Sequence, residues 1–147
     1  MTGVRPALVT CVPNISSGYC VAGKRMKLLN LRPMLRTEDV RATVRFYTEV
    51  LGFQVTGHME EDGELAWASL ELDGVGVMAA VPNHHEPFLG PVFSGSLYIN
   101  VDDVGAMWER VQNKAKICYP LEAFDEGMRE FAIYDNNGYL LQFGQPK

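Results

Sequence analysis

Long apolar runs, a surplus of basic charge and a cysteine framework are all missing from this chain of 147 residues. No run of about 18 apolar residues occurs, so the sequence predicts no membrane-spanning helix. Thirteen Lys and Arg face eighteen Asp and Glu, and the net charge of −5 argues against non-specific nucleic-acid binding. Cys11, Cys20 and Cys118 are an odd number without metal spacing, which excludes a disulfide framework and a zinc site. With 47% hydrophobic and 21% charged residues, we expect a soluble cytoplasmic globular protein.

The first 25 residues show neither the period of a helix nor the sustained alternation of a strand. Pro6, Pro13 and scattered glycines indicate irregular structure. A short apolar stretch ends at Pro13, which fits a secretory signal poorly. We therefore expect a flexible extension over residues 1–26. An artefact of the start site and an arm that covers a partner are the alternatives.

The remainder of the chain consists of two copies of one unit. Adding 64 to a position between Asp39 and Met78 often gives a similar residue. The matching pairs are Asp39-Val40 with Asp103-Val104, Trp67-Ala68 with Phe131-Ala132, and Asp73-Gly74 with Asn137-Gly138. Apolar residues also recur in both copies at the spacing of one helix face. We interpret residues 27–147 as a single domain, with repeat one at 27–81, a linker rich in Pro and Gly at 82–91, and repeat two at 92–147.

Each repeat predicts a strand, a helix and three further strands, a βαβββ unit. The expected elements of repeat one are strand 29–35, helix 39–50 and strands 53–58, 66–72 and 75–81. Those of repeat two are strand 96–101, helix 103–115 and strands 117–121, 130–134 and 139–143. Asp39 marks a helix start, Gly52 a helix end, and Asp73-Gly74 a two-residue hairpin. The fold class is therefore α+β, with two mixed sheets curling around a shared cleft that suits a small molecule.

Three segments carry a family resemblance. They are LRPMLRTEDVRATVRFYTEVLGF (31–53), GSLYINVDDVGAMWERV (95–111) and MREFAIYDNNGYLLQF (128–143). They resemble the glyoxalase/bleomycin resistance/dioxygenase superfamily, also called vicinal oxygen chelate (VOC) proteins. Within it the chain is most similar to the bleomycin-resistance-type binding proteins, through Pro33, the Ser96–Ile99 strand, and Arg129–Ala132 followed by the turn Asp135–Gly138. The resemblance covers essentially residues 27–147 and implies the VOC fold.

The resemblance also identifies four positions at which the metalloenzymes of this superfamily carry His or Glu. They are Arg32, Met78, Ser96 and Gln142 in this chain. A hard divalent ion needs carboxylate or imidazole ligands, and a guanidinium stays protonated and cannot ligate. The set therefore predicts no metal, no other cofactor and no catalytic residue. An enzyme of the glyoxalase or dioxygenase class with an atypical metal site remains the alternative.

By the same resemblance, a ligand lies in a groove between the sheets. The predicted lining residues are Arg32, Met34, Trp67, Met78, Ser96, Tyr98, Leu140 and Gln142. Aromatic and Met side chains suit flat or apolar ligands, although core packing is the alternative for Trp67 and Tyr98. The implied function is metal-independent binding and sequestration of a small molecule, such as a bleomycin-like antibiotic. The implied assembly is a homodimer whose first-strand arms exchange, so that each groove is shared between chains.

Cues to the charge of the ligand disagree. Acidic turns at 60–64 and 122–126 would attract a cation, unless they are simply solvated hairpin tips. Arg32 would instead pair with a ligand carboxylate or phosphate, or with an acidic neighbour. The resistance proteins carry a Trp where this chain has Gly127-Met128, which argues against bleomycin itself as the ligand.

Other groups with chemical potential have simpler interpretations. We expect His58 to be a surface histidine paired with Glu60 or Glu61, and His84-His85 to be solvated loop residues whose side chains diverge. Cys118 lies in a predicted strand, where a small buried hydrophobic residue is the expected role.

Overall fold

The computed structural model describes residues 29–85, 87–124 and 127–146. The predicted extension 1–26, with Cys11 and Cys20, lies outside the described residues. The chain divides into two units, 1–31 and 32–147, and the fold described below belongs to the second.

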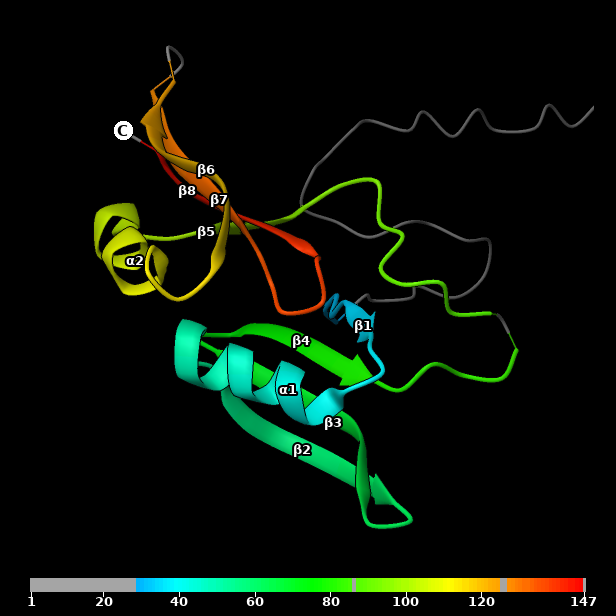
Figure 1. The fold of residues 1–147 in the computed structure, drawn as a ribbon. Coiled ribbons are helices and arrows are strands. Elements are labelled where there is room, and N and C mark those ends of the chain that lie inside the picture. The colour runs from blue at the N-terminus through cyan, green and yellow to red at the C-terminus, as the bar shows by residue number, and fades with distance from the viewer. Residues whose placement is uncertain (1–28, 86, 125–126, 147) are drawn as a thin grey trace, which may run out of the picture. The chain divides into compact units, whose positions relative to one another are not determined.

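Two βαβββ repeats make up this unit (Figure 1). Repeat one contains β1 (Met34–Arg36), α1 (Val40–Arg45), η1 (Phe46–Leu51), β2 (Gln54–Glu61), β3 (Glu64–Leu72) and β4 (Val75–Ala80). Repeat two contains β5 (Leu97–Asn100), α2 (Val104–Val111), β6 (Lys116–Ala123), β7 (Met128–Tyr134) and β8 (Leu140–Pro146). The strands form two mixed sheets in the orders β1-β4-β3-β2 and β5-β8-β7-β6, in which the first strand pairs parallel with the last. The predicted α+β fold is confirmed.

Local signals fix where both helices begin and where the first one ends. The carboxylates of Asp39 and Asp103 accept hydrogen bonds from the backbone N–H of Ala42 and Ala106, at 2.8 and 2.9 Å. These are side-chain N-caps, which satisfy donors that the first helical turn leaves free. Gly52 ends η1, a π-helical continuation of α1, with a φ of 88°. Both predicted helix starts and the glycine stop are therefore confirmed. The predicted end of the second helix at 115 is wrong, since α2 ends at Val111 and residues 112–114 form a turn.

The first strand is shorter than predicted. We expected 29–35, and β1 covers Met34–Arg36. Pro33 has no N–H to donate, and its carbonyl accepts from the N–H of Met78 at 2.8 Å where the pairing begins.

The offset of 64 holds for the first and last strands but not for the third. Met34 pairs with Met78 in one repeat, and Tyr98 pairs with Gln142 in the other. In the third strands, however, Ser69 pairs with Met78 and Ala132 with Gln142, which is an offset of 63. The β3–β4 turn holds an even number of residues and the β7–β8 turn an odd number, so the register slips by one.

This slip changes which residues correspond. The structural counterpart of Trp67 is Glu130, so the predicted match of Trp67 with Phe131 is wrong. Phe131 is fully buried instead, with its ring 5.2 Å from that of Trp108 and stacked on Phe143.

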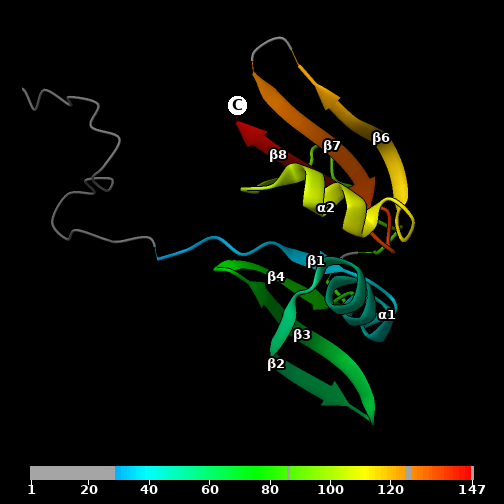
Figure 2. The same ribbon diagram turned by 90° about the vertical axis from the view of Figure 1, so that its left-hand side faces the viewer.

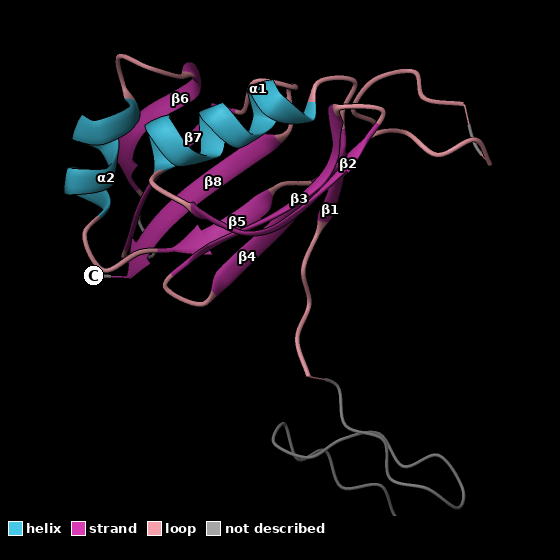
Figure 3. Ribbon diagram, turned by 90° about the horizontal axis from the view of Figure 1, so that it is seen from below, coloured by secondary structure: helices cyan, strands magenta, loops and turns pink. Residues whose placement is uncertain are grey.

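Each helix covers one face of the sheet in its own repeat. α1 packs on β3 and β4, and α2 packs on β7 and β8 (Figures 2 and 3). Side chains from both repeats, Tyr47, Leu51, Phe131 and Phe143 among them, then join in one hydrophobic core. No helix in the described part of the chain is long and apolar enough to cross a membrane.

The sheet faces opposite the helices are free of helices, and we call them the first and second open faces. The first carries Arg32, Met34, Trp67, Ser69, Glu71 and Met78. The second carries Ser96, Tyr98, Tyr119, Glu130, Leu140 and Gln142.

Candidate functional site

The structure places all eight predicted site residues on the open faces, four on each. Strand alternation explains this placement, since successive side chains of a strand point to opposite faces. In β1, Leu35 is 5% exposed and belongs to the core, whereas Met34 is 53% exposed and lies on the first open face. In β8, Leu141 is fully buried, so that its neighbours Leu140 and Gln142 lie on the second open face.

Arg32 lies across the backbone of Gly76, and its charge is already paired. A Cβ on Gly76 would come within 2.9 Å of the Arg32 guanidinium, so this contact depends on glycine. The guanidinium donates to the Glu71 carboxylate and, at 3.4 Å, to the Ser69 hydroxyl. Of the partners considered for Arg32, the structure shows the acidic neighbour.

Trp67 lies over another glycine of the first open face. Its ring carbons are 3.4 Å from where a Cβ on Gly57 would stand, and its pairing partners in the neighbouring strands are Met59 and Ala80. Together with Met34 and Met78, the indole gives this face an apolar, polarisable surface beside the Arg32 pair. Trp67 is half-buried on the open face and takes no part in the helix-side core.

A continuous chain of hydrogen bonds crosses the second open face. The Ser96 hydroxyl donates to the Gln142 side-chain oxygen, and Gln142 Nε2 donates to Tyr119 Oη at 2.8 Å. Tyr119 and Tyr98 then donate from their hydroxyls to the two oxygens of Glu130, each at 2.9 Å. Two predicted residues that are distant in sequence, Ser96 and Gln142, are thus brought into direct contact.

Tyr98 and Tyr119, the two phenols in this series of hydrogen bonds, both have a raised pKa and stay protonated at neutral pH. Burial raises the pKa of Tyr119 to about 12, opposed by the hydrogen bond from Gln142 and reinforced by Glu130. The pKa of Tyr98 is raised by desolvation and by its hydrogen bond to Glu130. The phenols are therefore hydrogen-bond donors at neutral pH, and the face offers a ligand polar contacts rather than a nucleophile.

Tyr119 and Glu130 were missed by sequence reasoning. In repeat two the resemblance indicated positions on the first and last strands, whereas these two residues come from β6 and β7. The correct register would have placed Glu130 opposite Gly144, where a Cβ would clash with Tyr98. Gly144 is therefore the sequence feature that could have indicated the contact, because a glycine inside a strand often marks the close approach of a neighbouring group.

The metal-ligand positions of the superfamily do not form a donor set for a divalent ion here. Arg32 is ion-paired, Met78 offers a thioether, and Ser96 and Gln142 bond to each other. A hard ion prefers carboxylate or imidazole groups, and a guanidinium beside it would repel it. No group of three or more His, Cys, Asp or Glu that could hold a metal occurs within the described ranges.

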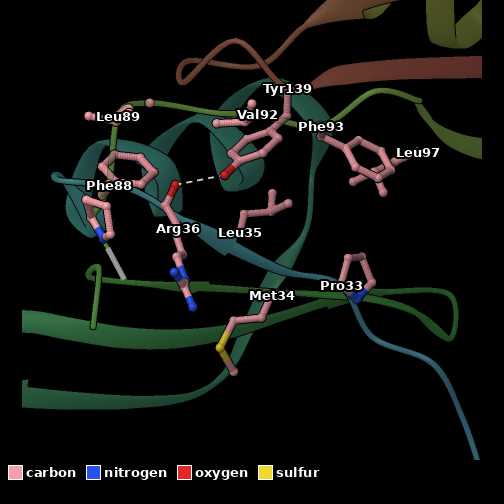
Figure 4. A pocket seen from close by; sticks show the side chains of 12 residues that line it. Pro33, Met34, Leu35, Arg36, Phe88, Leu89, Val92, Phe93, Leu97 and Tyr139 are labelled. Atoms are coloured by element: carbon pink, nitrogen blue, oxygen red, sulfur yellow. Dashed lines mark hydrogen bonds between the residues drawn. The ribbon is translucent and has the colours of Figure 1, made fainter. Parts of the chain in front are cut away.

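A cavity of about 520 Å³ lies elsewhere, between β1 and the segment 87–93 (Figure 4). Its lining includes Leu35, Phe88, Phe93 and Tyr139, and of the eight predicted residues Met34 borders it. Sequence analysis treated residues 82–91 as a linker and missed this cavity. The apolar residues of PFLGPVF at 87–93 could have indicated that this segment packs against the domain.

Two predictions outside the site are wrong. Cys118 is exposed, because it lies on the edge strand β6, where an irregularity in the register separates Ile117 from Tyr119. The rings of His84 and His85 do not diverge, since their centroids are 4.1 Å apart, although both residues are exposed as expected.

The first acidic turn has a basic partner on α1. Arg41 lies 3.7 Å from Glu60 and 3.5 Å from Glu64, and it donates to the Gly63 carbonyl at 3.1 Å. This contact partly offsets the negative charge of the β2–β3 hairpin tip. His58 is exposed on β2, as expected of a surface histidine.

Solved structures share this fold at low sequence identity. TioX from Micromonospora sp. ML1 is 23% identical, with a TM-score of 0.66 over 80% of this chain and 99% of its own. TnmS3, an antibiotic binding protein from Streptomyces sp. CB03234, is 19% identical, with a TM-score of 0.65 over 84% of this chain and 100% of its own. A glyoxalase/bleomycin resistance protein/dioxygenase from Nocardioides is 18% identical, with a TM-score of 0.64 over 82% of this chain and 85% of its own. Among curated proteins, no match to the chain was found.

A family model covers most of the two repeats. It matches residues 31–143, from the residue before Arg32 to the end of the core-facing part of β8. This range contains both open faces and all eight predicted site residues. The chain belongs to the Glyoxalase/Bleomycin resistance protein/Dioxygenase superfamily.

Proposed function

We propose that the protein binds and sequesters a small molecule on its open faces, without a metal ion and without chemistry. The observation that carries this proposal is the state of the four metal-ligand positions. Arg32 is neutralised by Glu71, and Ser96 is bonded to Gln142, so these polar groups are satisfied within the protein. The surrounding surface of Trp67, Tyr98 and methionines suits binding of a flat apolar group.

An antibiotic is the proposed ligand class. The fold is shared with TnmS3, which is described as an antibiotic binding protein, and this likeness supports the proposal without identifying the compound. Glu130 gives the second open face a carboxylate that two phenols hold in place, which suits a ligand with a hydrogen-bond donor or a cationic group.

We further propose that the ligand is enclosed in a cytoplasmic homodimer. Each open face carries four of the eight predicted residues, and the hydrogen bonds of each set stay within its own sheet. In a single chain Met34 is 53% exposed and Tyr98 is 43% exposed. A dimer with exchanged first-strand arms would cover these side chains and enclose a groove that one face alone leaves open.

A thermal-shift screen of cationic glycopeptides and small aromatic compounds tests the binding function. A ligand that binds the native state stabilises it by mass action, so a saturable rise in melting temperature is expected. Trp67→Ala should abolish the rise. Val75→Ala is the matched control, because Val75 is exposed but lies outside the open faces.

Two results would contradict the binding proposal. One is a full thermal shift that survives Trp67→Ala. The other is tightly bound metal in stoichiometric amount, lost together with an enzymatic activity in Gln142→Ala, which would establish the alternative of an enzyme with an atypical metal site.

Sedimentation analysis tests the dimer separately. The wild-type chain should sediment as a dimer, and Met34→Glu should shift it to a monomer, since a carboxylate would enter an apolar interface. A wild-type monomer that still binds its ligand would refute the dimer and leave the binding function standing.

A further inference from the structure

The cavity between β1 and the segment 87–93 touches the first open face at Met34 but lies mainly on the other side of β1. Figure 4 shows Leu35 and Tyr139 close together, with Phe88 and Phe93 around them, whereas the side chains of Met34 and Arg36 point to the other side of β1. This is the alternation that a strand imposes on successive side chains. β1 therefore forms a wall, with the predicted groove on one side and the cavity on the other.

The floor of the cavity is buried and its polar atom is satisfied. Leu35 is 5% exposed and Tyr139 is 9% exposed. The hydroxyl of Tyr139 donates to the backbone carbonyl of Arg36 at 3.1 Å, so its only side-chain polar atom is already used. A ligand that reaches this floor meets aliphatic and aromatic surface.

The rim of the cavity is apolar and exposed to water. Leu89 is 87% exposed, Val92 is 89% exposed and Phe93 is 54% exposed. Covering such surface is favourable by about 25 cal/mol for each Å² removed from water. Because the floor is recessed behind this rim, the site is concave, which suits a small molecule better than a flat protein surface.

Charge narrows the class of ligand further. In the part of the chain that the structure describes, the lining residues are uncharged apart from Arg36, whose side chain points away from Leu35 and Tyr139. A volume of about 520 Å³ falls within the range of small-molecule pockets. We propose that this cavity is a second binding site, independent of the open faces, which takes an uncharged ring compound.

Titration of the full-length chain with Nile red, an uncharged planar dye that fluoresces in apolar surroundings, tests this proposal. Saturable fluorescence with one dye per chain is expected. Phe88→Ala and Phe93→Ala should each weaken dye binding by roughly five- to tenfold, since each removes one aromatic contact. Both residues lie in the segment outside the core, so the variants should keep the wild-type far-ultraviolet circular dichroism.

Two control variants locate the dye. Phe124→Ala removes an aromatic side chain of similar exposure, 42%, that lies outside the cavity, and it should leave dye affinity unchanged. Trp67→Ala, which is expected to abolish ligand binding on the open faces, should also leave the dye unaffected.

Four outcomes would overturn the second site. They are fluorescence that does not saturate, one dye per two chains, equal weakening by Phe124→Ala and Phe93→Ala, and loss of the dye in Trp67→Ala with Phe93→Ala intact. The last would place the dye on the open face, so the proposed function would stand while this inference failed.

Discussion

Tyr119 links the two ends of the hydrogen-bond chain on the second open face. It accepts from Gln142 and donates to Glu130, so its protonation state depends on both neighbours. Burial is the main reason that its pKa is raised to about 12, the Gln142 hydrogen bond lowers it, and the Glu130 carboxylate adds to the rise.

Glu130→Gln should therefore lower the pKa of Tyr119 while leaving it above the usual value of 10.0. The substitution removes the negative charge that opposes ionisation of the phenol, but burial of the phenol remains. Ultraviolet titration of the tyrosinate absorbance measures the change, and the Tyr119→Phe variant identifies which step belongs to Tyr119. A Tyr119 titration that is the same in Glu130→Gln and wild type would mean that Glu130 has no influence on it.

The contacts and the exposure of single side chains were harder to predict from the sequence than the helices and strands. The family resemblance indicated which positions line the groove, and all eight predicted residues lie on the open faces, to which strand alternation directs most of them. The partners of these residues depend on neighbouring strands, so the sequence did not identify Glu71 as the acidic neighbour of Arg32, and it did not indicate the contact of Tyr119 with Gln142. Cys118 was misjudged for the same reason, since an edge strand is defined by its missing neighbour.

At the scale of the element, the sequence predicted every strand and helix of the described repeats, because caps and turns act over a few residues. Asp39, Asp103 and Gly52 were sufficient to place both helix starts and the end of the first helix, whereas α2 ends at Val111, before the predicted 115. The pairing register of the third strands was not predictable to the residue. The β3–β4 turn has an even number of residues and the β7–β8 turn an odd number, and a shift of one residue moves each side chain to the opposite face of the sheet. The cavity was missed because it depends on where an irregular segment packs.

The two helix N-caps should contribute independently to stability. Asp39→Ala and Asp103→Ala should each lower the free energy of unfolding by about 1 kcal/mol, because each leaves a backbone N–H of the first turn without its acceptor. The double variant should be additive within about 0.5 kcal/mol, since the caps lie in different repeats.

Urea denaturation measures these changes, with Asp102→Ala as the matched control. Asp102 is an exposed aspartate next to the second cap, and its substitution should cost less than about 0.5 kcal/mol. An equal cost for Asp102→Ala and Asp103→Ala would show that the charge, rather than the cap, is responsible.

At the scale of the whole molecule, a buried carboxylate joins the two repeats. Asp135 of repeat two is 5% exposed and accepts from Tyr47 Oη of repeat one at 3.1 Å. It also accepts from the backbone N–H groups of residues 137–139, each at 2.9 Å. Burial outweighs these hydrogen bonds and raises the pKa of Asp135, while burial and Asp135 raise the pKa of Tyr47 well above its usual value.

The raised pKa of Asp135 predicts a pH dependence with a definite sign. The folded chain holds this proton at higher pH than the unfolded chain, so between the two pKa values the folded state carries more protons. The contribution of Asp135 to the free energy of unfolding is therefore largest below the ordinary pKa of Asp, and it falls as pH rises through the raised one. Asp135→Asn removes this dependence.

Urea denaturation at a series of acidic pH values measures this effect. As pH rises from the ordinary pKa of Asp through the raised pKa of Asp135, the free energy of unfolding of the wild type should fall relative to that of Asp135→Asn. Above this pH window the difference between the two free energies should stay constant. The Tyr47→Phe variant tests the cause. It removes a hydrogen bond that lowers the pKa of Asp135, so it should extend the window to higher pH and cost about 1 kcal/mol at neutral pH. If wild type instead gains stability over Asp135→Asn as pH rises, the hydrogen bonds outweigh burial. The carboxylate joining the repeats would then be held charged, and its ionisation would strengthen the junction rather than weaken it.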